Sequence, residues 1–479
     1  MVGVRTVRSG AMLALFAMAT IALPFNALPY FKSVFREMAN EGAFYPLAMA
    51  AAIYALHVLM GRRIYLPKHH SAAVLATFVS WVGISGAANF LDIIDSFTKG
   101  RSGAEKYIFQ YALLLFVAAS SLLVYQLGRG DVGLLLRFRR YAAYSLIPVS
   151  IYCLVEVLAI FGSAEAISFL QSFDYFIRDQ EVGIAIFRRL RSVSGEPSYF
   201  AMYIGFVFPW VFSYLITEEK SRWPYLLLVA YLIVLLTLTF SRSAYGVLAL
   251  QIFLLLLGVM FHGGRGRRRE RSKIFWAVTT IAAVVVAMGV LDVIALDTVG
   301  GTLISLLDTE NIANIGRYGS QVAAFGMAAD NPVFGVGFGQ YAFKMPAYVP
   351  NWAKVSPEIV EWMSASPDSV WAPALGLYAR IAGELGFVGL ALWATVWVSL
   401  LLSCYRRFKL HSTRLDRCDG IGLALLVSLI GILMAGLNSD SLRFFGYWIL
   451  LGLCWIYLES AQVSDGRSSN RDHNAGKAI

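Results

Sequence analysis

The chain has 479 residues, of which 58% are hydrophobic and only 15% are charged, and its formal net charge at pH 7 is +10. Soluble domains carry about 25% charged residues, so this composition excludes a large soluble enzyme and indicates a polytopic membrane protein. We expect basic residues in such a protein to mark the orientation of its loops before they indicate nucleic acid, which we do not expect as a partner.

Apolar stretches of about 20 residues, long enough to cross a hydrocarbon core of about 30 Å, follow one another along most of the chain. They predict an all-α fold with about twelve transmembrane helices. The predicted spans are 11–30, 45–61, 71–93, 108–127, 144–162, 200–217, 225–240, 244–261, 274–295, 387–405, 421–437 and 445–460. We expect the first to be retained, because it lacks a convincing signal-peptide cleavage site.

Short loops rich in Arg and Lys predict the orientation. With the N-terminus inside, the cytoplasmic connections are 61–70, 128–140, 218–224, 262–273 and 406–417. This alternation follows the positive-inside rule and predicts that both termini are cytoplasmic. The polar segment 462–479 lacks periodicity and is predicted to be a disordered tail.

The first of two long loops on the outer side spans 163–199 and ends in a group of arginines, Arg188, Arg189 and Arg191. Their predicted position on the outer side is unusual, because arginines of membrane proteins concentrate in the cytoplasmic loops. Pro197 suits the first turn of the following helix. Glu196, just before it, could either cap that helix or orient an arginine and act as a base, and both roles stay open.

Arg242 lies in the short outer turn "FSRSAYG" between two predicted spans. The simpler explanation is an arginine that snorkels from a helix end. However, ionisable groups held at membrane depth usually mark a substrate or ion pathway. We therefore favour a functional role for Arg242.

The second long outer loop, 297–386, is predicted to contain several helices. Arg317 lies near the start of one helical pattern, which ends at Asp330, and Ser356 precedes a proline in a helix-start signature. The glycines at 335, 337 and 339 do not have the spacing of a dinucleotide-binding motif and instead indicate a turn packed close to a helix. Arg380 lies in the helical pattern that leads into the next predicted span. An uncharged residue there would cost less free energy to bury, so we expect Arg380 to have a function.

Six outward arginines form the candidate site: Arg188, Arg189, Arg191, Arg242, Arg317 and Arg380. Guanidinium groups bind phosphate through two parallel hydrogen bonds and stay charged when partly buried, so the set suits a lipid-linked phosphate or pyrophosphate. The histidines and cysteines fall in spans or inner loops, so we expect no metal and no cofactor. Candidate bases are Glu196 and Asp368, followed by Glu361 and Asp440.

Four stretches together resemble the O-antigen polymerase and O-antigen ligase superfamily: "RSVSGEPSYFAMY", "TFSRSAYG", "GRYGSQVAAFGMAADNPVFGVGFGQY" and "ELGFVGL". The resemblance covers roughly residues 180–400. It implies that 1–461 is one GT-C-like glycosyltransferase domain of the bacterial inner membrane. Members of this superfamily act at the periplasmic face on sugars linked to undecaprenyl pyrophosphate, without a metal.

Matched by motif, Arg242 and Arg317 would contact the pyrophosphate, Arg191 would support them, and Tyr199 and Tyr341 would bind substrate. The expected partners are lipid-linked donor and acceptor oligosaccharides, membrane lipids and a chain-length regulator protein. The ligase branch carries a histidine just before "ELG", whereas "APALGLYARIAGELG" has none, which favours the polymerase branch.

Two alternatives stay open. One is ligation of polysaccharide to the lipid A core. The other is a transporter or flippase for the same lipids, although no pseudo-repeat relates 1–220 to 225–461.

Overall fold

The computed structural model describes residues 10–178, 189–218, 222–261, 312–367, 369–411 and 417–475. At Arg242, Phe261, Ala313, 410–411, 417–419 and 461–475 the description covers the backbone alone.

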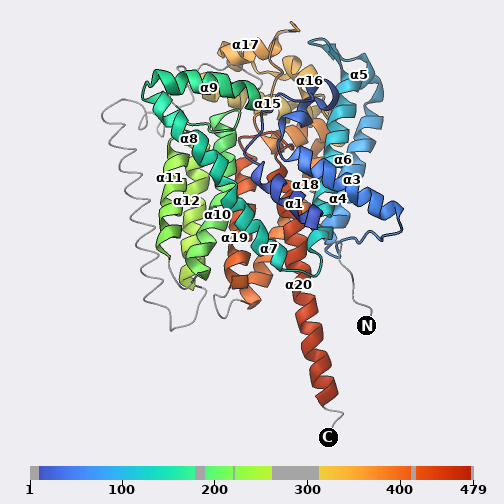
Figure 1. Ribbon diagram of the computed structural model, residues 1–479. Helices are drawn as coiled ribbons and strands as arrows, with labels where there is room; N and C mark the ends of the chain where they lie inside the picture. The colour runs from blue at the N-terminus through green and yellow to red at the C-terminus, as the bar shows by residue number, and fades with distance from the viewer. Residues whose placement is uncertain are drawn as a thin grey trace.

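Helices form nearly all of the regular structure in these residues (Figure 1). The first half contains α1 (Gly10–Ile21), α2 (Lys32–Phe35), η1 (Arg36–Asn40), α3 (Phe44–Leu59), α4 (His70–Ala88), α5 (Phe90–Asp95), α6 (Gly103–Gly128), α7 (Gly133–Tyr144), α8 (Leu146–Ile160) and α9 (Ala164–Ile177). The second half contains α10 (Pro197–Thr217), α11 (Trp223–Thr237), α12 (Arg242–Phe261), α15 (Ile312–Asp330), α16 (Tyr341–Tyr348), η4 (Asn351–Val355), α17 (Pro357–Met363), α18 (Leu377–His411), α19 (Arg417–Ala435) and α20 (Phe445–Ala475). Strands β1 (Phe97–Thr98) and β2 (Arg101–Ser102) form one antiparallel hairpin.

The predicted all-α membrane architecture is confirmed in its coarse form. Among the described residues, six helices are long and apolar enough to cross a membrane, or seven if the bent pair α2–η1 and α3 counts as one span. Shorter apolar helices lie at Gly10–Ile21, Trp223–Thr237, Gly420–Ala435 and Phe445–Ser460. The predicted span 274–295 lies outside the described residues, so the count of twelve stays a prediction.

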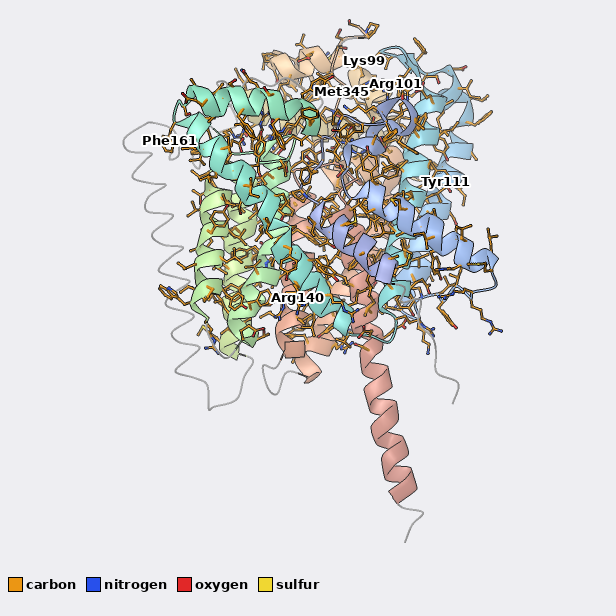
Figure 2. All side chains as sticks on the ribbon, in the orientation of Figure 1. Lys99, Arg101, Tyr111, Arg140, Phe161 and Met345 are labelled. Atoms are coloured by element: carbon orange, nitrogen blue, oxygen red, sulfur yellow. The ribbon has the colours of Figure 1, made fainter. Side chains whose placement is uncertain are left out.

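The bundle has two ends that differ in what they carry. Figure 1 shows α5, α9 and α15–α17 together at one end, which we call the outer end, and α7 and the start of α19 towards the other, the inner end. Figure 2 places Lys99 and Arg101 at the outer end and Arg140 at the inner end. Two of the basic loops, 61–70 and 128–140, meet at the inner end, where the Arg129 guanidinium lies 3.6 Å from the centre of the Tyr65 ring, as expected if they share one side of a membrane.

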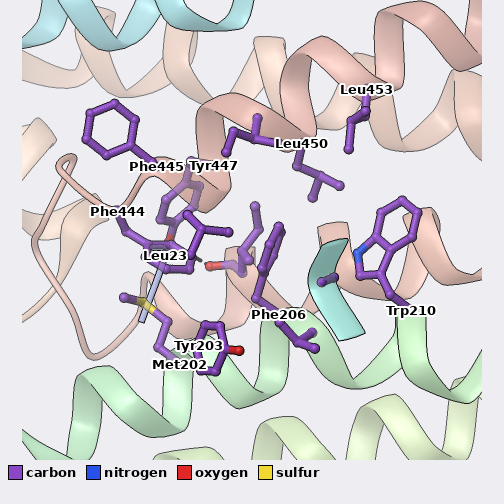
Figure 3. Packing of buried hydrophobic residues seen from close by; sticks show 14 of the residues in the cluster. Leu23, Met202, Tyr203, Phe206, Trp210, Phe444, Phe445, Tyr447, Leu450 and Leu453 are labelled. Carbon is purple, nitrogen blue, oxygen red and sulfur yellow. Dashed lines mark hydrogen bonds between the residues drawn. The ribbon is translucent and has the colours of Figure 1, made fainter. Parts of the chain in front are cut away.

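The centre of the bundle is formed by α10 and α20, whose apolar residues are almost all buried. Figure 3 shows Phe206 of α10 toward Phe444 and Tyr447, with Trp210 further along α10 on the side of Leu450 and Leu453. The rings of Phe206 and Phe444 meet edge to face at 5.7 Å, a geometry that aromatic quadrupoles favour. These two helices therefore pack against other helices rather than against lipid.

A break in α18 positions the outer part of the bundle. Gly386 has φ 70° and ψ 179° inside this helix, a conformation essentially restricted to glycine. The turn after α15 packs here: Val336 N donates to Gly383 O and Phe387 N to Pro332 O, at 3.0 and 2.8 Å. The predicted glycine turn against a helix is thus confirmed, and Gly335 within it has φ 65°.

Replacing Gly386 by alanine is expected to destabilise the protein. A Cβ at this position would lie 2.3 Å from Val333 O, and the backbone conformation alone costs about 1–3 kcal/mol for other residues. The measurement is the thermal midpoint of the purified protein in detergent. Gly246→Ala on α12 is the control, because its Cβ would have no neighbour within 4 Å; an equal fall in both variants would contradict the prediction.

The end of the chain differs from the sequence prediction of a disordered tail over 462–479. Helix α20 continues to Ala475 and extends beyond the bundle in Figure 1. Once its packed portion has formed, each further residue adds one helical hydrogen bond without a new nucleation cost. The last four residues, 476–479, lie outside the described residues.

Candidate functional site

Glu37 joins several polar side chains at the outer end. It lies on η1, in a segment bent by 109° from α3. Its carboxylate accepts hydrogen bonds from Lys106 Nζ at 2.5 Å and from Gln110 Nε2 at 2.6 Å. Lys106 and Gln110 are four residues apart and thus on one face of α6. Because η1 lies just before this bend, the Glu37 carboxylate reaches the first turns of α6.

Arg380 extends this cluster from α18. Its guanidinium pairs with Glu384 at 3.2 Å, one turn further along the same helix. It also donates to Gln110 Oε1 at 3.3 Å and to Asp440 O at 3.0 Å. The start of α18 is held in place because Leu377 N donates to Gly436 O. Arg380 thereby connects α6, α18 and the loop between α19 and α20.

Arg443, in that same loop, completes the cluster. Its guanidinium donates to the backbone oxygen of Glu37 at 3.3 Å. Burial alone would lower the pKa of Arg443, but Tyr199, Glu37 and Glu41 raise it above its usual range. Among the described residues, no ion pair of 4.0 Å or less joins Arg443 to a carboxylate. Arg443 is therefore a fixed, charged guanidinium whose hydrogen-bonding capacity is not consumed by an acid.

A small hollow lies beside Glu37 between the η1 segment and α6. It is lined by Phe35, Arg36, Glu37, Met38, Arg101, Glu105, Lys106, Phe109, Gln110 and Leu113. Arg36 pairs with Glu105 at 3.1 Å, and Lys106 Nζ lies 4.6 Å from the centre of the Trp371 ring. We call Arg36, Arg101, Lys106, Arg380 and Arg443 the outer basic cluster. Such a combination of cations and aromatic rings can bind an anionic, sugar-bearing ligand.

Arg191, predicted to support the pyrophosphate, lies instead in a buried ion network. It pairs with Asp174 at 3.0 Å and with Glu156 at 3.8 Å. Arg178 pairs with the same Asp174 oxygen at 2.7 Å and donates to Ser194 O at 3.0 Å. Burial and the neighbouring Arg178 lower the pKa of Arg191, while Asp174 opposes them. The network holds the loop before α10.

Arg189 and Arg242 come together at the turn between α11 and α12. Arg189 donates to the backbone oxygens of Thr239 and Phe240, at 3.0 and 3.2 Å. Arg242 is the first residue of α12, two positions after Phe240, and its side chain lies outside the description. The segment that carries Arg189 thus lies beside the turn that precedes Arg242.

Arg317 lies on the exposed surface of α15. It shares a helix face with Gln321, whose side-chain amide donates to Leu437 O at 3.2 Å. Leu437 begins the loop that carries Asp440 and Arg443. Arg317 thus lies one helical turn from a residue that contacts the loop of Arg443.

The remaining candidates have different surroundings. Glu196 is exposed at the N-cap position of α10 without a side-chain cap, and accepts a hydrogen bond from Ser198 at 3.2 Å. Tyr341 is buried and its hydroxyl donates to Ser320 O at 2.8 Å, which fits a packing role. Tyr199 is one of the groups that raise the pKa of Arg443. Arg188 and Asp368 lie outside the described residues.

Glu37, Lys106, Gln110 and Arg443 were missed by the sequence argument. Arg36, Arg101, Lys106 and Arg443 all fall on the predicted outer side, so the charge-bias argument applied to Arg242 would have identified them. Within the described ranges, no group of three or more His, Cys, Asp or Glu side chains could hold a metal ion. The described groups offer anion binding through arginine and lysine, with Glu196 as an accessible carboxylate.

The chain was compared with family models and with curated proteins. No family model matches the chain, and no curated protein matches it in sequence.

Proposed function

We propose that the protein is a membrane glycosyltransferase that polymerises oligosaccharide repeat units carried on undecaprenyl pyrophosphate. The reaction would occur at the outer end, which corresponds to the periplasmic face of a bacterial inner membrane. The observation that carries the proposal is Arg443, a charged guanidinium without an ion-pair partner among the described residues, which lies with Arg380 at the outer end.

The chemistry follows from where negative charge develops. Transfer of the growing chain breaks the bond between the anomeric carbon and the pyrophosphate oxygen, and the electron pair leaves with the pyrophosphate. Arg443 and Arg380 would stabilise that charge, since both are held in place before substrate binds. Arg317, exposed on α15, would contact the outer phosphate, and Arg242 stays a candidate from its motif.

The attacking group is a sugar hydroxyl of a second lipid-linked unit, which must lose a proton. Glu196 is exposed at the start of α10, three positions before Tyr199, one of the groups acting on Arg443. We assign it as the general base, with Asp368 as the second candidate from the sequence. The sugars would lie against the surface between η1 and α6, where Phe35 and Phe109 provide apolar contact.

The alternatives differ in product. A ligase would transfer the chain to lipid A core, and the stretch before Glu384 lacks the histidine of that branch. A flippase would move the lipid without changing it. The purified protein in detergent with lipid-linked repeat units should therefore yield a ladder of longer glycans and free undecaprenyl pyrophosphate.

This assay separates the classes. Products formed only when lipid A core is added would indicate a ligase. Transport of intact lipid in vesicles without a glycan ladder would indicate a flippase, and either result would overturn the proposed polymerase.

A further inference from the structure

Helix α9, at the outer end, has three chemically distinct faces. Its buried face consists of Ala166, Leu170, Asp174 and Ile177. A second face carries Phe169, Phe173 and Phe176, which are exposed to 54, 40 and 58%. A third, solvent-exposed face is mainly polar and carries Glu165, Ser168, Gln171, Ser172 and Tyr175. At 100° per residue the three phenylalanines fall on one narrow stripe, between the buried face and the polar face.

The phenylalanine stripe continues a lipid-facing surface. Helix α8, part of the candidate span from Gly133 to Ile160, exposes an apolar row at helical spacing. This row is Ile147, Ile151, Leu154, Leu158 and, just after the helix, Phe161. Apolar residues at such positions of a span face acyl chains. Because α9 follows α8 after only three residues, Phe169 is the next exposed ring along the same surface.

The path of the chain turns α9 away from the direction of α8. Gly162, with φ 93°, allows the turn, and the Ser163 hydroxyl caps the new helix by accepting from Ala166 N at 3.3 Å. Figure 1 shows α9 lying across the outer end of the bundle above α8, and Figure 2 places Phe161 at the edge of the molecule near it.

The rotation of α9 about its own axis is fixed by its buried face. Asp174 accepts hydrogen bonds from Arg178 and Arg191, at 2.7 and 3.0 Å, and from the Tyr152 hydroxyl on α8. The helix cannot turn its phenylalanines inward without breaking these buried ion pairs. The rings of Phe169 and Phe173 instead stack on each other at 5.7 Å, which leaves a continuous apolar ridge exposed.

We propose that α9 is an interfacial helix whose Phe169, Phe173 and Phe176 insert among the acyl chains of outer-leaflet phospholipids, while its polar face meets water. Amphipathic helices with aromatic residues bind at this depth, and aromatic side chains are enriched at membrane interfaces. Part of the long loop 163–199 therefore belongs to the membrane surface, and through Asp174 it anchors the loop that leads to α10.

The test measures the depth of single positions on α9. Phe173→Cys and Gln171→Cys, each labelled with an environment-sensitive fluorophore, are reconstituted into phosphatidylethanolamine–phosphatidylglycerol vesicles. The labelled parent protein supplies the background from native cysteines. The probe at 173 should be quenched several-fold more by lipids with a spin label high on the acyl chain than the probe at 171. Aqueous iodide should show the opposite order.

Equal quenching at both positions would overturn the proposal. Protection of position 173 from both lipid and iodide would overturn it as well, since another protein surface would then cover the stripe. Phe176→Cys repeats the measurement at a second stripe position, and a monodisperse elution profile excludes a variant that has lost its fold.

Discussion

Arg443→Ala is expected to slow polymer formation by about 100- to 1000-fold, the loss that follows removal of one preorganised donor to a developing anion. Arg443 meets Glu37 through a backbone oxygen at 3.3 Å, and the Glu37 carboxylate keeps its ion pair with Lys106 at 2.5 Å when Arg443 is removed. The fold should therefore persist while the charge opposite the leaving group is lost. The measurement is the initial rate of glycan ladder formation with purified lipid-linked repeat units.

Two matched variants sharpen the result. Arg443→Lys keeps the charge but not the planar fork, so we expect an intermediate rate. Arg62→Ala removes an exposed arginine at the inner end and should leave the rate unchanged. A near-normal rate for Arg443→Ala, with correct insertion, would remove Arg443 from the mechanism.

Asp174→Ala should lower the free energy of unfolding by about 3–5 kcal/mol, the usual result of breaking a buried ion pair on one side. Asp174 balances both Arg178 and Arg191, and all three are buried. Without it the two guanidinium groups lose their shared carboxylate in a low-dielectric site, where Glu156 lies 3.8 Å from Arg191. The loop from Arg191 to Ser194 should then lose its anchor.

Thermal unfolding in detergent measures this change. Glu165→Ala is the control, because Glu165 lies on the same helix but is exposed, and it should change the midpoint little. Asp174→Asn keeps the shape of the side chain but removes its charge. Its thermal midpoint should lie between those of Asp174→Ala and Glu165→Ala. An unchanged midpoint for Asp174→Ala would show that the network contributes nothing to stability.

Local features of the chain could be predicted well from sequence. The pattern around Arg317 predicted a helix ending at Asp330, and α15 ends there. Pro197 and Pro357 open α10 and α17 as their position before apolar runs indicated. These outcomes depend on neighbours within a few residues, and the restricted φ of proline acts at that range.

The partners of charged residues could not be predicted in the same way. Arg443 meets Glu37 across 406 positions of sequence, and no local pattern relates them. Arg191 was expected to bind pyrophosphate because it is basic and outside. Its ion pairs with Asp174 and Glu156 come from two other helices. The sequence shows that a buried arginine needs a counter-ion. Whether that counter-ion is a carboxylate of the protein or a ligand depends on how the helices pack.

The central position of α20 has a consequence for biosynthesis. Gly452 on this helix lies so close to α6 that a Cβ there would be 2.6 Å from Ser121 O, and Leu450, Leu451 and Leu453 are fully buried. The ribosome makes α20 more than 300 residues after α6, so α6 enters the bilayer before this partner exists. Premature stop codons anywhere upstream of Phe445 should yield chains that quality-control proteases remove, however much of the polypeptide has already been inserted.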